Sequence, residues 1–156
     1  MKFLHPEDYQ EKCSLRFSYY KDEICKLVPK CKVEHIGASS IPNLISKGDL
    51  DIFIGVNKDE FENTITVLHQ LNFQEKTGSL RTDELCMLES KNENVAFQVV
   101  VNGSKYEFFI TFRDILINNP DLIKEYNLLK ETCIGYSQEK YRKVKSEFIE
   151  NVLSST

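Results

Sequence analysis

The amino-acid sequence predicts an α/β (α+β) fold in which a small mixed β-sheet carries flanking helices and a helical part completes the chain. Strand-like and helix-like segments alternate up to about residue 103, which is typical of a sheet covered by helices. Three strand-like segments follow one another directly, which predicts antiparallel neighbours within the sheet. From about 104 to 153 the pattern is helical. A length of 156 residues suits one domain, expected over 1–156.

The first expected element is an amphipathic helix over Pro6–Leu27. Its apolar residues Leu15, Tyr19 and Ile24 recur at near-helical spacing. Pro6 suits a first helical turn, because the N–H that proline lacks has no partner there.

Two strands are expected on either side of a glycine turn. Lys32–Ile36 alternates and ends at Gly37, whereas Asp49–Val56 alternates and then becomes continuously apolar, like a central strand. The segment between them has room for one or two helical turns.

The later elements are marked by caps and turn signals. Asn57 and Glu60 form a capping-box pattern ahead of a helix over Lys58–Leu71. Three further strands are expected, at Phe73–Lys76, Glu84–Leu88 and Val95–Val101. Three helices complete the chain: Lys105–Ile117 opened by a Ser104/Glu107 capping box, a second from Asn119-Pro120-Asp121 to about Cys133, and a third from Ser137 to Val152.

Charge and composition disfavour several classes of protein. A formal net charge of −4 gives no general attraction to nucleic acid or to an anionic membrane. The apolar runs are far shorter than the ~20 residues that span a bilayer, and the polar N-terminal segment is unlike a signal peptide. Five widely spaced cysteines without a CxxC pair indicate reduced thiols, as expected in the cytoplasm.

The Asp49-x-Asp51 pair is the candidate catalytic and metal-ligating motif. Residues two apart on a strand share a face, so both carboxylates project together while Leu50 and Ile52 enter the core. Two adjacent carboxylates suit Mg²⁺, which takes the remaining ligands from water and substrate phosphate. The alternative is that both are solvated turn residues, because D-x-D pairs are common.

The turn before this strand is the candidate phosphate site. Gly37 allows close approach of the backbone to a phosphate, and the hydroxyls of Ser39 and Ser40 add donors. Lys47 adds a positive charge two residues before Asp49.

The segment from His35 to Val56 (HIGASSIPNLISKGDLDIFIGV) resembles the nucleotidyltransferase superfamily signature, and within it the GrpB (UPF0157) family. The matching positions are Glu34, His35, Ile36, Gly37, Ser40, Pro42, Leu44, Lys47, Asp51 and Ile52. The block Phe112–Lys130 and a third block with Tyr141, Lys145 and Phe148 resemble later family segments. The resemblance implies a nucleotidyltransferase-like fold, with Mg²⁺ and a nucleoside triphosphate as ligands.

Three positions depart from the family pattern. Asp49 stands where GrpB proteins have an aliphatic residue and the wider superfamily has an acid, and Ala38 replaces a serine. Gln98 stands where the superfamily has a third carboxylate, the general base, and where GrpB proteins tend to have a histidine. Candidate replacements for that acid are Glu84, Glu89 and Glu107, the last already explained as part of a capping box.

For several other residues a structural role explains the sequence as well as a functional role does. His35 is expected to be a structural histidine more often than a substrate contact. Arg113 and Asp114 are expected to tie a helix to the sheet or to touch substrate. One helix face is expected to bind phosphates or to face solvent, and it carries Lys140, Tyr141 and Lys145.

These observations predict transfer of a nucleoside monophosphate from a triphosphate to an unidentified acceptor. Because Gln98 is a poor base, a catalytically degenerate nucleotide-binding module of the same fold is the alternative, and enzymatic activity is left open.

Overall fold

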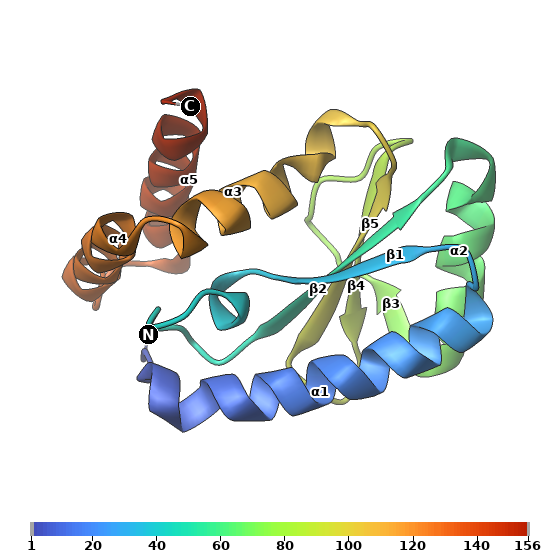
Figure 1. The fold of residues 1–156 in the computed structure, drawn as a ribbon, viewed down its shortest axis with the longest axis horizontal. Coiled ribbons are helices and arrows are strands. Elements are labelled where there is room, and N and C mark those ends of the chain that lie inside the picture. Colours follow the sequence, from blue (N-terminus) through green and yellow to red (C-terminus); the bar gives the residue numbers. More distant parts are fainter. Residues whose placement is uncertain (1, 156) are drawn as a thin grey trace.

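The computed structural model describes residues 2–155 and contains one mixed sheet (Figure 1). Its strands lie in the order β1-β2-β5-β4-β3. They are β1 (Lys32–Ile36), β2 (Leu50–Val56), β3 (Phe73–Glu75), β4 (Leu85–Ser90) and β5 (Val95–Val101). β2 and β5 are parallel and the other pairs are antiparallel. The predicted mixed α/β architecture is therefore confirmed, with strand ends differing by one or two residues.

One face of the sheet is covered by α1 (Pro6–Leu27) and α2 (Phe61–Leu68), which enclose the main hydrophobic core (Figure 1). The predicted apolar face of α1 was wrong in part, because Leu15 and Tyr19 are 69% and 59% exposed. Ile24 is buried as predicted, together with Tyr9, Cys13 and Tyr20. Two tyrosines are accommodated because their hydroxyls donate to Leu44 O (2.6 Å) and Glu93 Oε2 (3.0 Å).

The caps were predicted with mixed success. Asn57 and Ser104 make no side-chain cap, so both capping-box predictions were wrong; each residue precedes a 3₁₀ turn, Lys58–Glu60 and Lys105–Glu107 respectively. Asn119 and Ser137 do cap their helices, accepting from Leu122 N and Lys140 N.

The opposite side of the sheet carries α3 (Phe108–Ile117), α4 (Pro120–Thr132) and α5 (Gln138–Ser154). These helices pack on one another and on the 3₁₀ turn Ala38–Ser40 through a second hydrophobic cluster, while the start of α3 packs on the sheet through a third. In Figure 1, α3 runs from beside the sheet toward α4 and α5, which stand beyond one end of the sheet, away from α2. None of the helices within residues 2–155 combines the length and apolarity needed to cross a bilayer.

Candidate active site

A cavity of about 320 Å³ lies between the sheet and the C-terminal helices, a volume within the range of ligand pockets. Its walls come from β1, β2, β4 and β5 on one side and from α3, α4 and α5 on the other. The charged side chains that line it are two carboxylates and five cations: Asp49, Asp51, Lys47, Lys76, Lys130, Arg142 and Lys145. The aromatic side chains are Phe108, Phe109, Phe112, Tyr126 and Tyr141.

The strand β2 aims Asp51 into this cavity. Its neighbours Leu50 and Ile52 are 1% and 0% exposed and belong to the main core, so the alternation of the strand turns Asp51 to the opposite face. Asp49 lies just before the strand, lines the same cavity and accepts a hydrogen bond from Asn94 Nδ2 at 3.1 Å.

Gly37 lies directly against the Asp51 carboxylate. Its φ of +74° is in the left-handed region, and a Cβ added there would lie 2.5 Å from Asp51 Oδ2. Glycine is therefore required at this position twice, once by the backbone conformation and once by the close approach.

The surroundings of Asp51 change its proton affinity. Burial raises the pKa of its carboxyl to about 6, an effect opposed by Lys145 and reinforced by Asp49. A carboxylate held in this way is stabilised by any added cation, including a divalent metal ion.

Gln98 lies beside Asp51 on the parallel neighbour β5. It is 7% exposed, and its Nε2 donates to Asp51 Oδ1 at a long 3.4 Å. Its Oε1 is buried without a hydrogen-bond partner among the described residues. This position on β5 thus holds an amide next to the carboxylate, while Glu84, Glu89 and Glu107 are not among the cavity-lining residues.

Two lysines of the C-terminal helices enter the cavity. Lys130, on α4, is 3% exposed; its Nζ donates to Ile45 O at 2.9 Å and lies 4.6 Å from the centroid of the Tyr126 ring. Burial lowers its pKa to about 7, with a further lowering by Lys145. Lys145, on α5, keeps solvent contact but is surrounded by the cavity walls, and this desolvation lowers its pKa although Asp51 acts to raise it.

Lys47 lies at the mouth of the cavity. Its Nζ is 3.5 Å from Gln138 Oε1 and 5.7 Å from the Tyr141 ring centroid. The side chain is exposed and therefore free to turn toward an anion.

The hydroxyls of Ser39 and Ser40 are engaged outside the cavity. Ser39 is 5% exposed, with its Oγ 2.8 Å from His35 Nε2, and Ser40 Oγ donates to Gly37 O at 2.6 Å. In this conformation both serines hold the turn rather than line the cavity.

His35 points to the core side of the sheet. Its ring stacks on Phe17 with centroids 5.0 Å apart, and burial, helped by Arg113, lowers its pKa to about 4. It is a neutral residue of the core face and not one of the cavity-lining residues.

Arg113 ties α3 to β1. Its Nη1 donates to His35 O at 2.9 Å, and its Nη2 pairs with Glu34 Oε1 at 3.2 Å and Asp114 Oδ1 at 3.0 Å. These bonds join the two walls of the cavity, so the family-like Phe-Arg-Asp segment has a structural explanation here.

Three of the cations, Lys76, Lys130 and Arg142, were not singled out from the sequence. Lys76 follows β3 in a segment without a motif, and a lysine near a helix C-terminus, such as Lys130, usually complements the helix dipole. Of the three, Lys130 alone had a sequence signal, because it ends the second family-like block.

The donor set fits Mg²⁺ bound together with a phosphate ligand. Within residues 2–155 no group of three or more His, Cys, Asp or Glu side chains is placed to hold a metal. Mg²⁺ needs fewer, because it binds through one or two carboxylates and takes the rest from water and substrate phosphates. Asp49, Asp51 and the unpartnered Gln98 Oε1 are oxygen donors of that kind.

The chain is similar to known proteins in sequence and in fold. Residues 6–155 match a family described as GrpB protein. A UPF0157 protein of Vibrio cholerae is 54% identical over 154 residues, which cover 98% of this chain and 82% of that protein. The crystal structure of the conserved protein GrpB from Enterococcus faecalis matches with a TM-score of 0.75 at 20% identity, covering 96% of this chain and 98% of that chain.

A more distant likeness concerns the fold alone. The RNA terminal uridylyl transferase Cid1 matches with a TM-score of 0.58 at 11% identity. The match covers 80% of this chain and 40% of Cid1. The sheet and its helices are therefore of the nucleotidyltransferase type.

Proposed function

The chain belongs to the GrpB family, as its motifs predict, and we propose that it acts as a magnesium-dependent nucleotidyltransferase. It binds a nucleoside triphosphate in the cavity between the sheet and helices α3–α5 and transfers the nucleoside monophosphate to an acceptor. The observation that carries this proposal is the meeting of two carboxylates and five cations in one cavity.

Each group has a role in this proposal. Asp49 and Asp51 hold Mg²⁺, which, when bound, neutralises charge on the reacting phosphates. Lys47, Lys145 and their basic neighbours hold the triphosphate. Gly37 keeps the turn backbone close to Asp51, and the serines after it fix the conformation of that turn.

The relatives support a nucleotide as the ligand. Solved structures of Cid1 include complexes with MgGTP and MgATP. A cavity on the same fold with carboxylates beside cations is suited to the same chemical class, a magnesium-bound triphosphate.

Calorimetry tests the proposal. ATP and GTP are titrated into the protein with and without Mg²⁺, and into Asp51→Asn. We expect binding that requires Mg²⁺ and falls at least tenfold in the variant, because one carboxylate ligand is lost. Asp83→Asn, whose side chain is 79% exposed and outside the cavity, is the matched control. Binding that is independent of Mg²⁺ and unaffected by Asp51→Asn would contradict the metal site.

A second candidate function follows from Gln98. An amide beside Asp51 is no general base, which favours a nucleotide-binding module without turnover. The two functions differ in pyrophosphate release: magnesium-dependent binding without pyrophosphate, across hydroxyl and phosphate acceptors, would favour the binding module.

A further inference from the structure

The cavity lacks a proton acceptor where a hydroxyl acceptor would need one. A hydroxyl that attacks phosphorus must lose its proton, and a positioned base typically accelerates this by about 10²–10⁴. The β5 side chain next to Asp51 is the amide of Gln98, which has no useful basicity.

The other described residues of the cavity do not replace that base. Asp49 and Asp51 are its only carboxylates, and under the proposed function both are held as metal ligands. A triphosphate beside the basic side chains favours their protonated forms, which cannot accept a proton. Lys130, whose pKa is lowered to about 7, is buried and already donates to Ile45 O. His35 lies on the other face of the sheet.

The same side of the cavity is instead suited to an anion. Gln98 pairs directly with Met87 in the β4–β5 register, and Met87 O accepts the backbone N–H of Lys76 at 2.9 Å. An uncharged amide on β5 and a lysine just after β3 thus lie at one level of the sheet, with β4 between them, and both line the cavity. A carboxylate at position 98 would repel an anion there, whereas an amide N–H donates to it.

From these contacts we propose that the acceptor is a phosphate group, free phosphate or a small phosphate monoester, held by Gln98 and Lys76. This proposal rests on the proposed function. An anionic phosphate oxygen of the acceptor attacks the α-phosphorus of the nucleoside triphosphate and forms a P–O–P bond. The bond from the α-phosphorus to the bridging oxygen breaks, and its electron pair leaves with pyrophosphate. The attacking oxygen carries no proton, so no base is required.

Binding gives a test that does not depend on turnover. The protein is saturated with Mg²⁺ and an ATP analogue whose α,β-bridge is methylene, and is then titrated with glycerol 3-phosphate or with glycerol. We expect measurable affinity for glycerol 3-phosphate only, reduced at least tenfold in Lys76→Gln and in Gln98→Glu. Lys124→Gln, an exposed change on α4 outside the cavity, should leave it unchanged.

Turnover separates the two proposals. With ATP and Mg²⁺, phosphorus NMR should show a new diphosphate linkage on glycerol 3-phosphate or inorganic phosphate and none on glycerol. Failure to bind the magnesium nucleotide overturns the proposed function and this inference together. Nucleotide binding with transfer to glycerol, or acceptor affinity equal in Gln98→Glu and the unchanged protein, overturns this inference alone. Thermal unfolding of Gln98→Glu shows whether that variant is folded, and the exposed Lys76→Gln tests the site independently.

Discussion

The side-chain amide of Gln98 lies with Nε2 3.4 Å from Asp51 Oδ1 and with Oε1 buried and unpartnered among the described residues. The half-buried Asp51 carboxylate therefore receives only one long hydrogen bond from its neighbour on β5. Since burial raises the pKa of Asp51 to about 6, ionising this group at neutral pH costs stability that a bound cation recovers.

Asp51→Asn should stabilise the ligand-free protein at pH 7. The folded-state pKa of about 6 exceeds the ordinary aspartate pKa of 3.8, so the folded state holds the proton more tightly and stability falls as pH rises from about 4 to 6. Allowing for partial solvent access, we expect a gain of about 1–2 kcal/mol at pH 7 and none at pH 3.5. Urea unfolding of both proteins at several pH values measures the difference. If the free energies of unfolding of the two proteins differ by the same amount at every pH, the pKa of Asp51 is not raised in the folded state.

Gly37→Ala should lower the free energy of unfolding by more than the positive φ of Gly37 alone explains. The left-handed conformation costs a non-glycine residue about 1 kcal/mol, and the new Cβ would also lie 2.5 Å from Asp51 Oδ2. Gly103→Ala is the matched control, because its φ of +82° is similar and nothing lies within 4 Å of an added Cβ. We expect about 1 kcal/mol of destabilisation for the control and about 2–4 kcal/mol for Gly37→Ala, measured by urea unfolding. Equal losses would contradict the close approach to Asp51.

Lys130→Met should change how stability depends on pH. The pKa of Lys130 is lowered from 10.5 to about 7 by burial, so the unfolded state binds its proton more tightly. Stability from this group therefore rises as pH increases from about 7 to 10 and is lost as pH falls toward 7.

Methionine keeps the apolar length of Lys130 without a charge. We expect the variant to be more stable by about 1–3 kcal/mol at pH 7 and to lose this advantage near pH 10. The loss of the bond to Ile45 O limits the gain. Denaturant unfolding across this range measures the difference, and Lys124→Met on the exposed side of α4 is the control. A constant difference across pH would contradict a depressed pKa.

Local pattern was enough to predict most elements and the direction of Asp51. Alternation over β2 depends on adjacent residues only, so the burial of Leu50 and Ile52 and the opposite orientation of Asp51 follow from the strand itself. The helix caps at Asn119 and Ser137 were predictable for the same reason, because each side chain accepts from a backbone N–H three residues later in the chain.

The basic half of the cavity depends on long-range arrangement. Lys76 reaches the cavity because β4 lies between β3 and β5, and Lys130 because α4 packs across the Ile45 backbone. Neither the order of strands in a sheet nor the packing of a helix on it can be predicted from a short sequence window. The burial of Tyr20 on α1 was not predicted for a similar reason, because Glu93, which accepts its hydrogen bond, is far away in the chain.

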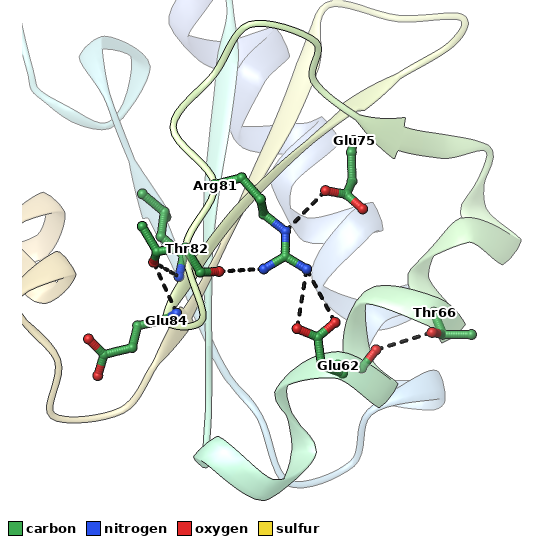
Figure 2. A network of polar contacts seen from close by, with 7 residues as sticks. Glu62, Thr66, Glu75, Arg81, Thr82 and Glu84 are labelled. Atoms are coloured by element: carbon green, nitrogen blue, oxygen red, sulfur yellow. Dashed lines mark hydrogen bonds and ion pairs between the residues drawn. The ribbon is translucent and has the colours of Figure 1, made fainter.

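The loop between β3 and β4, which begins at Lys76, is held by Arg81 (Figure 2). Arg81 Nε donates to Glu75 Oε1 at 3.0 Å, and Nη2 lies 3.2 Å from both oxygens of Glu62 on α2. Its Nη1 donates to Thr82 O. One guanidinium therefore ties together the end of β3, the loop and a helix.

Arg81→Lys should loosen this loop, because an ammonium cannot reproduce the planar fork. We expect a loss of about 0.5–1.5 kcal/mol in unfolding free energy, as for a partly exposed ion-pair network, and a few-fold weaker binding of glycerol 3-phosphate to the magnesium-nucleotide complex through Lys76. Lys58→Gln removes a more exposed pair with Asp83 in the same loop, at 3.7 Å, and should change neither quantity by a measurable amount. Urea unfolding and calorimetry give the two readouts. Unchanged glycerol 3-phosphate affinity in a destabilised Arg81→Lys would show that the loop does not set the position of Lys76.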